Sequence, residues 1–365
     1  MRPLRFVALG DSLTEGVGDP VGEAWRGWAA LLADGLAGGV PEGVPDGVPD
    51  GVSEGTPGGV AEGTPGGVPV GAPAGLGRGS DGGLAAGAAG EPSGGFTGGT
   101  AGGPGDGTSR RAVGGPSDVP GASVEFTNLA VSGAQTRDVL ERQTPKALAL
   151  RPDVVSVVIG VNDTLRCTFD IHAVAARLDA VYAAFRDQGA VLLTACLPDP
   201  GAMLGLPGSL ARPLARRQRA VNAVVHALSE RYGAVHVHAA EGAWLTDREL
   251  WSADRLHPGE RGHRQLALRF HASLALRGVA TGPAPSAEPE FPAPTRSASL
   301  WWLATAGTGW VARRCTDLLP QLLTLAAAEV RHRARGTSAR LDLGASHAVA
   351  SALAALSGGE QPDAA

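Results

Sequence analysis

Short apolar runs of strand length alternate with segments of helical periodicity, and this alternation limits the fold more than any other feature. The strand-like runs are Arg5–Leu9, Val124–Leu129, Val154–Ile159, Ala190–Cys196 and Ala234–Val237. The helical segments are Trp25–Leu36, Thr136–Leu150, Ile171–Asp187 and Leu210–Tyr232. Continuous apolar strands are typical of a parallel sheet that is buried on both faces. The sequence therefore predicts an α/β fold in which a central parallel sheet lies between two layers of helices.

One long segment interrupts the alternation. Residues 37–121 contain 30 of the 54 glycines and 11 of the 27 prolines in the chain. The segment has few large apolar side chains, so it cannot offset the entropy lost when its backbone is ordered. We therefore expect residues 1–36 and 122–278 to form one globular domain, with residues 37–121 as a disordered insertion in a surface loop.

The sequence after residue 278 has three further parts. Residues 279–299 are rich in proline, alanine and serine, which is typical of a linker. Residues 300–335 regain helical periodicity, which predicts an amphipathic helical extension. We favour docking of its apolar face on the body or on a second subunit, and peripheral contact with an anionic membrane is the alternative. Residues 336–365 are expected to form a disordered tail, and the oligomeric state stays open.

Composition argues against several classes of protein. No uncharged apolar run reaches membrane-spanning length, and a formal net charge of −5 argues against nucleic acid as a partner. Cys167, Cys196 and Cys315 are far apart without a C-x-x-C pair, so neither a disulfide framework nor a zinc site is expected. The short apolar run at the N-terminus lacks the features of a signal peptide, which favours a cytoplasmic protein.

Polar residues follow the predicted strands at their carboxyl ends. The four segments concerned are Gly10–Thr14, Asn128–Gly133, Gly160–Asp163 and Asp254–Pro258. Each segment taken alone has an ordinary explanation, such as a helix N-cap, a turn or a surface histidine. Ligands of open α/β sheets bind outside the carboxyl ends of the strands. Four polar segments at one sheet edge therefore predict a functional site.

The side chains of these segments permit nucleophilic acyl transfer. Ser12 is the candidate nucleophile, His257 the base that takes its proton, and Asp254 the group that orients the imidazole. The negative charge that develops on a carbonyl oxygen requires hydrogen-bond donors. The candidate donors of this oxyanion hole are the backbone amides of Ser12 and Gly133 and the side-chain amide of Asn162. This chemistry requires no cofactor and no metal.

The same four segments carry a family resemblance. In chain order they resemble blocks I, II, III and V of the SGNH (GDSL) hydrolases, and the resemblance covers residues 4–275 apart from the insertion. It implies a flavodoxin-like three-layer α/β/α fold and the mechanism of a serine esterase or lipase. It also implies the roles given above for Ser12, Gly133, Asn162, Asp254 and His257.

Three functions are compatible with these residues. A serine ester hydrolase would pass the acyl group from Ser12 to water, and an acyltransferase would pass it to an alcohol. A non-catalytic protein on this fold would only bind a ligand. We favour hydrolysis of small-molecule or lipid esters, and the acyl length is not fixed by the sequence.

Other side chains near the predicted sheet edge were also considered. Met203, Leu204 and Leu206 follow the fourth strand, so they either line an acyl-chain pocket or fold back on the core. The arginines of the helix 210–232 are expected to face solvent. His236 and His238 alternate on a strand and can point the same way, but no carboxylate or cysteine lies at matching spacing. We therefore favour ordinary strand histidines there.

Overall fold

The computed structural model describes residues 2–22, 24–36, 109–113, 123–292, 297 and 306–358. For residues 109–113, 243, 306–319 and 358 only the backbone is described. The chain divides into two compact units, of which one comprises Met1–Pro41 and Gly102–Ala365 and the other Glu42–Ala101. The second unit, and with it most of the predicted insertion, lies outside the described residues.

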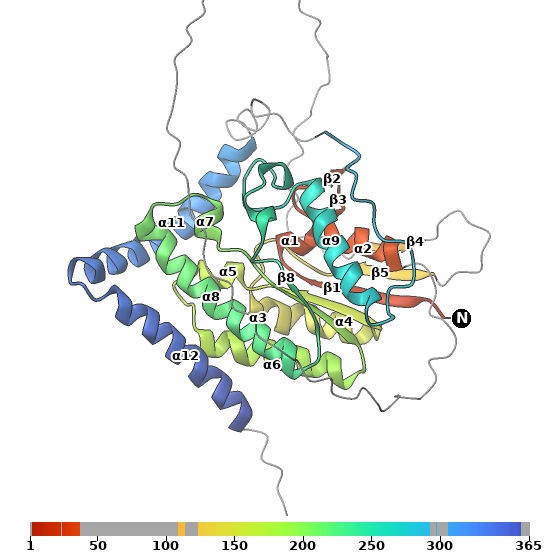
Figure 1. Cartoon of the computed structure of the whole chain (residues 1–365), viewed down its shortest axis with the longest axis horizontal. Helices are drawn as coiled ribbons and strands as arrows, with labels where there is room; N and C mark the ends of the chain where they lie inside the picture. The colour runs from red at the N-terminus through yellow and green to blue at the C-terminus, as the bar shows by residue number, and fades with distance from the viewer. Residues whose placement is uncertain are drawn as a thin grey trace, which may run out of the picture. The chain divides into compact units, whose positions relative to one another are not determined.

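A six-stranded sheet forms the middle of the described unit (Figure 1). Its strands are β1 Leu4–Gly10, β4 Ser109–Val113, β5 Val124–Asn128, β6 Val154–Val158, β7 Val191–Cys196 and β8 Val235–His238. They lie in the order β4-β5-β1-β6-β7-β8, and only β4 is antiparallel to its neighbour. The five parallel strands follow the flavodoxin-like order, which confirms the predicted fold class.

Helices cover both faces of this sheet. The longer ones are α2 Gly27–Leu36, α6 Ile171–Asp187, α8 Gly208–Arg231 and α9 Glu260–Ala275. Phe6 and Ala8 of β1 belong to the core that includes α2 and α9, while Val7 and Leu9 belong to the core that includes α6 and α8. Successive residues of a strand point to opposite faces, so the apolar run of β1 supplies both cores.

The remaining elements are short and mostly lie in loops. They are α1 Ser12–Glu15, β2 Pro20–Val21, β3 Ala24–Trp25, α5 Val161–Thr164, α7 Pro200–Met203, η2 Ala243–Leu245 and η3 Arg248–Leu250. Two of them, α1 and α5, directly follow the parallel strands β1 and β6. Ser12 and Asn162 therefore lie in the first turns of helices that follow neighbouring strands of the sheet.

The helix predicted over residues 136–150 contains a π turn. It consists of α3 Thr136–Asp138, the π turn η1 Val139–Gln143, and α4 Thr144–Leu150. The buried Gln143 amide accepts a hydrogen bond from Gly10 N and donates one to Gly10 O, both at 2.9 Å. A Cβ at Gly10 would lie 2.4 Å from the carbonyl oxygen of Val158, so the position requires glycine. The π turn thus fixes the strand end that leads to Ser12.

Two segments that were expected to lack structure form regular elements. Residues 109–113, within the predicted insertion, form the edge strand β4 by pairing with the free side of β5. The predicted tail 336–365 contains α12 Ser338–Gly358, so that prediction was wrong. Ala352 of α12 is buried, and Leu353 packs against the core of α6 and α8. The segment is rich in alanine and leucine, which favour a helix, and it also gains contact with α6 and α8.

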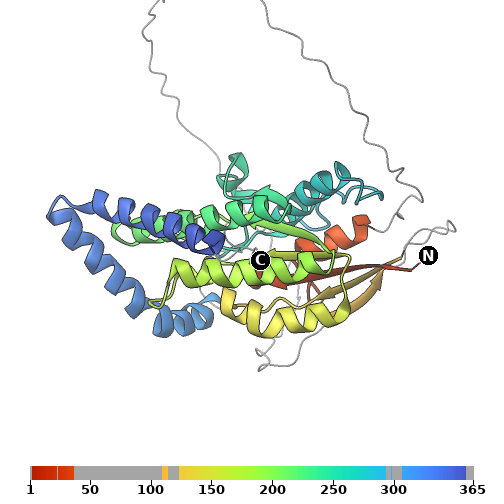
Figure 2. The same cartoon turned by 90° about the horizontal axis from the view of Figure 1, so that it is seen from below.

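The helical extension docks on the body through α8. Its helix α11 Ala306–Ala334 packs on α8, and α12 packs on both α6 and α8 (Figure 2). The guanidinium of Arg216 lies 3.2 Å from Glu329 of α11 and 2.8 Å from Asp342 of α12. The prediction that the arginines of this helix face solvent was therefore wrong for Arg216. Membrane contact through residues 300–335 stays a prediction, and no helix in the described ranges is long and apolar enough to cross a bilayer.

We expect Arg216→Ala to weaken the attachment of α11 and α12. The Glu329 side chain is only 2% exposed, so the substitution leaves a buried charge without its partner. Breaking a buried pair in this way typically costs about 3–5 kcal/mol. Limited proteolysis should release α11 and α12 from the domain faster in this variant. Arg219→Ala is the matched control, because Arg219 is 69% exposed and lies 3.8 Å from Asp342. Equal proteolysis of the two variants would contradict the assignment.

Candidate active site

The chain turns sharply from β1 into α1, and this turn presents Ser12. Asp11 is the N-cap of α1, and its carboxylate accepts a hydrogen bond from Leu13 N at 3.1 Å. Gly16 ends α1 in the left-handed region and touches Gly27 at the start of α2. A Cβ on Gly27 would lie 2.3 Å from the Gly16 Cα, so α2 can approach only because glycine stands there. These contacts hold Ser12 at the carboxyl end of β1.

His257 and Asp254 lie on a loop that closes on itself before α9. Ser252 N donates to His257 O at 2.9 Å, which holds the two ends of the loop together. Asp254 Oδ2 lies 2.6 Å from His257 Nδ1, and His257 Nε2 lies 2.7 Å from Ser12 Oγ. The structure thus assembles the three predicted residues into one hydrogen-bonded chain, although 245 positions separate Ser12 from His257.

The surroundings of Asp254 fix its protonation state and that of the imidazole it contacts. Burial alone would raise the pKa of Asp254, but hydrogen bonds from His257 and Ser252 and the charge of His257 lower it to about 2. The carboxylate is therefore ionised at neutral pH and accepts the hydrogen on Nδ1. In the neutral imidazole Nε2 then has a free lone pair, which can accept the Ser12 hydroxyl proton.

Two of the three predicted oxyanion donors are backbone amides, those of Ser12 and Gly133. Among the described residues, the amides of Ser12 and Gly133 have no hydrogen-bond acceptor. Gly133 adopts φ 83°, and its neighbour Ser132 donates from its amide to Glu15 of α1 at 2.8 Å. Gly133 does not line the cavity beside Ser12, whereas Asn162 does. The backbone around Gly133 is thus tied to the helix that carries the nucleophile.

The side-chain amide of Asn162 already has two acceptors. Its Nδ2 lies 3.0 Å from Asp11 Oδ2 and 3.1 Å from Ala134 O. Burial is the main cause that raises the pKa of Asp11 to about 6, and the hydrogen bond from Asn162 opposes it. Asp163, the next residue, accepts hydrogen bonds from Thr136 and anchors this loop to α3. Asn162 is therefore held at the site by a buried acidic side chain.

A small apolar cavity adjoins Ser12 and His257. Its volume is about 60 Å³, and its walls include Leu165, Met203, Trp244 and Trp251. The two tryptophan rings stack at 4.9 Å. Trp244 lies on the single turn η2 and Trp251 directly follows η3, and elements this short show neither strand alternation nor helical periodicity.

Of the three residues that were predicted to line an acyl-chain pocket, Met203 alone lines this cavity, and its role toward an acyl chain stays a prediction. Leu204 and Leu206 do not line the cavity, and Leu204 is 43% exposed. The physical reason is α7 Pro200–Met203. Asp199 is the N-cap of this helix and Leu204 is its C-cap. This single helical turn directs Met203 inward and places the residues that follow it on the outside.

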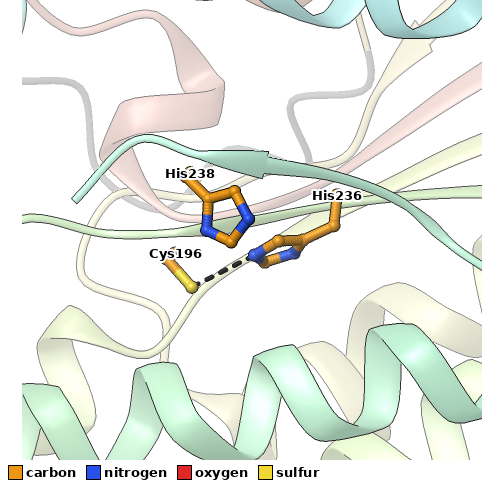
Figure 3. A group of neighbouring side chains, drawn as sticks. All are labelled: Cys196, His236 and His238. Carbon is orange, nitrogen blue, oxygen red and sulfur yellow. Dashed lines mark hydrogen bonds between the residues drawn. The ribbon is translucent and has the colours of Figure 1, made fainter. Parts of the chain in front are cut away.

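Outside this site, one group of described side chains has the composition of a metal site. Cys196, His236 and His238 bring their sulfur and nitrogen atoms within 4.8 Å of one another (Figure 3). The two histidines point the same way, as their alternation on one strand predicted. The sequence analysis missed Cys196 because it comes from the neighbouring strand β7 and not from a nearby sequence position.

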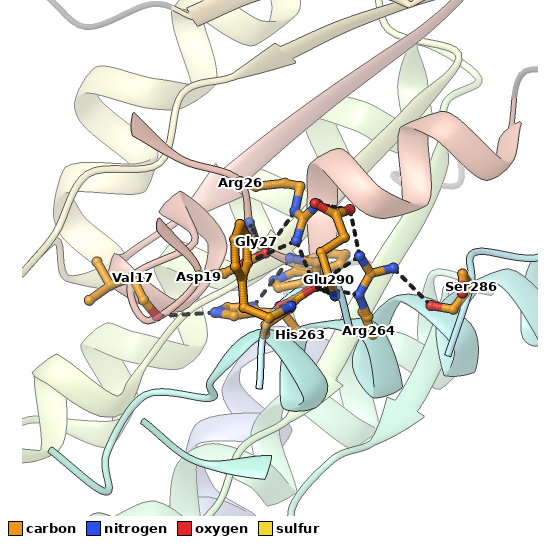
Figure 4. A network of polar contacts seen from close by, with 11 residues as sticks. Val17, Asp19, Arg26, Gly27, His263, Arg264, Ser286 and Glu290 are labelled. Carbon is orange, nitrogen blue, oxygen red and sulfur yellow. Dashed lines mark hydrogen bonds and ion pairs between the residues drawn. The ribbon is translucent and has the colours of Figure 1, made fainter. Parts of the chain in front are cut away.

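A buried ion-pair network holds the loop between α1 and α2 against α9 (Figure 4). The Arg26 guanidinium lies 3.0 Å from Asp19 and 3.1 Å from Glu260. Glu290 bridges Arg26 and Arg264, at 2.6 Å and 2.8 Å. Because Glu290 belongs to the predicted linker, that part of the linker is bound to the domain. The network thus joins the segment just before α2 to the start of α9, the helix that follows the His257 loop.

His263 lies next to this network and is fully buried. Trp28 N donates to its Nδ1 at 3.2 Å, so the ring hydrogen is on Nε2, which lies 3.0 Å from Val17 O. Burial is the main cause that lowers the pKa of His263 to about 4. A second ring proton would face the N–H of Trp28, so the folded protein requires the neutral imidazole.

This histidine should make stability depend on pH. Its pKa rises from about 4 in the folded chain to about 6.5 in the unfolded chain, so its contribution is complete above pH 6.5. As the pH falls toward 4 the unfolded chain binds the proton more readily, and about 2–3 kcal/mol is lost. Urea unfolding measures this effect. We expect the difference in the free energy of unfolding between the wild type and His263→Gln to shrink as the pH falls from 7 to 4.5. The difference for the exposed His347→Gln control should stay constant, and a constant difference for His263→Gln would refute the interpretation.

Comparisons with known proteins agree with this geometry. A family model described as the GDSL-like Lipase/Acylhydrolase family matches residues 98–265, which include Gly133, Asn162, Asp254 and His257. The acetylxylan esterase of Geobacillus stearothermophilus is 29% identical over 171 residues, which cover 44% of this chain and 76% of that protein.

Two solved structures are also similar. A structure of an acetylxylan esterase from Geobacillus stearothermophilus has 16% identity and a TM-score of 0.41, and the match covers 79% of this chain and 98% of that one. An α/β hydrolase from the metagenome of Lake Arreo, Spain, has 16% identity and a TM-score of 0.42, with 75% and 97% covered. The chain is therefore similar to the GDSL-like Lipase/Acylhydrolase family over residues 98–265, a range that does not include Ser12.

Proposed function

We propose that this chain is a serine carboxylic-ester hydrolase that forms an acyl intermediate on Ser12. One observation carries the proposal, namely the continuous chain from Asp254 through His257 to the Ser12 hydroxyl, with contacts of 2.6 and 2.7 Å. A serine hydroxyl becomes an effective nucleophile when such a base removes its proton. The sequence similarity to an acetylxylan esterase supports ester hydrolysis rather than ligand binding alone.

The reaction needs two steps. Ser12 Oγ bonds to the ester carbonyl carbon while its proton passes to His257 Nε2, and the C–O bond to the leaving alcohol breaks as the alcohol takes that proton. Water then loses a proton to Nε2 and attacks the acyl carbon, and Ser12 Oγ leaves with the proton from Nε2. The acid is released and the enzyme is regenerated.

The oxyanion of each step would bind to the donors around Ser12. The amides of Ser12 and Gly133 are available without breaking another hydrogen bond. Asn162 must turn one amide hydrogen from Asp11 or Ala134 toward the oxyanion. Each such donor typically contributes about 3–4 kcal/mol to transition-state stabilisation.

The cavity size favours short acyl groups. Its volume of about 60 Å³ is small, and its walls include the bulky side chains of Met203, Trp244 and Trp251. The walls are largely apolar, which suits a methyl or propyl chain better than a charged group. Acetyl to butyryl esters are therefore the substrate class that we assign.

Met203 should set the upper limit of acyl length. Met203→Ala removes part of the cavity wall, so we expect the ratio of kcat/KM for octanoyl over acetyl p-nitrophenyl esters to rise about tenfold. Leu204→Ala is the matched control, because Leu204 is exposed and outside the cavity. A ratio that changes equally in both variants would show that the acyl chain binds elsewhere.

Covalent labelling tests the proposed function directly. A fluorophosphonate should react once per chain, and peptide mapping should find the label on Ser12 and on no other serine. Failure to label a folded sample, or a label elsewhere, would refute the proposal. Product analysis with added alcohols completes the test, since a new ester as the main product would show acyl transfer instead of hydrolysis.

A further inference from the structure

A second group of reactive side chains lies on the ends of β7 and β8. In the parallel register of these strands Cys196 is opposite His238, and Thr194 is opposite His236. Cys196 Sγ lies 3.1 Å from His236 Nε2, and the rings of His236 and His238 are 4.8 Å apart (Figure 3). Cys196 is buried, His236 is half-buried and His238 is exposed, so the group opens toward solvent on one side.

A third imidazole approaches the same point from α8. The ring of His226 lies 5.3 Å from the rings of both His236 and His238. One thiol and three imidazoles therefore converge from two strands and one helix. Neutral imidazole nitrogens and thiolate sulfurs are the donors that zinc prefers in proteins.

Neighbouring hydroxyls fix which nitrogen of His236 faces the thiol. Ser229 Oγ donates to the Val225 carbonyl at 2.5 Å, so it accepts the hydrogen of Thr194 Oγ1 at 2.7 Å. Thr194 Oγ1 can then only accept, and it lies 2.9 Å from His236 Nδ1. The ring hydrogen is therefore on Nδ1, and the lone pair of Nε2 points at Cys196 Sγ. Buried partners of this kind commonly orient a histidine that binds a metal.

Burial affects the protonation of both Cys196 and His236. Burial, helped by the charges of His238 and His226, lowers the pKa of His236 to about 4, so the ring is neutral at pH 7. Burial, helped by the charge of Glu241, raises the pKa of Cys196 to about 11. A thiol that keeps its proton is a poor nucleophile, whereas a bound metal ion removes that proton.

We propose that Cys196, His236 and His238 form a binding site for a divalent transition-metal ion of the zinc class. On binding, the S–H proton of Cys196 passes to solvent as the bond from sulfur to the metal forms, and Nε2 of His236 gives its free lone pair to the ion. The site is separate from the triad. It does adjoin the cavity wall, because Leu197 and Ala239 line the cavity and directly follow Cys196 and His238.

Cobalt(II) is the probe that reports both binding and the sulfur ligand. The untagged full-length chain, freed of metal with a chelator, should bind one equivalent of Co²⁺ with a thiolate-to-cobalt charge-transfer band in the near ultraviolet. Zn²⁺ should displace the cobalt and remove the band. The thermal midpoint should rise with added Zn²⁺, because a ligand that binds only the folded chain stabilises it.

Cysteine variants provide matched controls. Cys196→Ser should abolish the charge-transfer band, and His236→Gln should weaken Co²⁺ binding at least about tenfold. Cys167→Ser and Cys315→Ser should retain both band and affinity. Circular dichroism of the metal-free variants checks that each is folded, and Cys196→Ala serves as a second variant where serine is not tolerated. Absence of stoichiometric binding by the wild type, or a band that persists in Cys196→Ser, would overturn the proposal.

Discussion

Ser12→Ala is expected to lower kcat/KM for p-nitrophenyl acetate by about four to six orders of magnitude. The hydroxyl is the only atom of this side chain that contacts His257, at 2.7 Å, and alanine removes it without adding bulk. The backbone amide of residue 12 stays in place, so substrate binding should change little. Stopped assays with purified protein measure the loss against the spontaneous hydrolysis of the ester.

Folding must be separated from chemistry in this experiment. Thermal unfolding of Ser12→Ala should match the wild type, because the hydroxyl is half-buried and its hydrogen bond is to the base alone. Ser273→Ala on α9 is the control, since Ser273 bonds only to Arg269 O. If a folded Ser12→Ala sample kept its turnover, Ser12 could not be the nucleophile. That result would refute the proposed mechanism.

Asp254→Asn should reduce kcat by about four orders of magnitude while KM stays similar. The asparagine oxygen can still accept hydrogen bonds from Leu256 N and His257 N, so the loop keeps its shape. Its amide, however, offers a hydrogen where the carboxylate offered a lone pair to His257 Nδ1. The imidazole would then carry its hydrogen on Nε2, where it cannot accept the proton of Ser12.

A second aspartate provides the control for this substitution. Asp247 caps η3 by accepting from Glu249 N, and Asp247→Asn should leave kcat unchanged because it keeps that acceptor. Equal kcat values for Asp254→Asn and the wild type would mean that the carboxylate only shapes the loop. A loss in kcat that the control does not share supports the orienting role.

Much of the fold followed from local patterns, for physical reasons that particular elements show. The run Val154–Ile159 is buried on both faces, and the helix Ile171–Asp187 was predicted with the bounds that it has. Such elements repeat one period over many residues, so each residue adds to the same signal. The segment 338–358 is rich in alanine and leucine, which favour a helix, so here the signal was present in the sequence and the expectation of disorder overlooked it.

The site was predictable where chemistry and position coincide in the sequence. Ser12 follows β1 directly, Asp254 and His257 stand in a recognisable segment before α9, and the structure brings the three together. Cavity walls such as Trp244 were missed because an element as short as η2 shows no period. Contacts between distant segments were missed for a different reason, since Cys196 meets His236 only through strand pairing.

The place of β1 in the sheet has a consequence for biosynthesis. The ribosome delivers this central strand first, yet its neighbours β5 and β6 follow only after residues 11–123 have been translated. At about 5–20 residues per second, the apolar strand waits on the order of 10 seconds for a partner. During that time β1 has no neighbouring strand to pair with, and unpaired strand edges of this kind favour aggregation in the nascent chain.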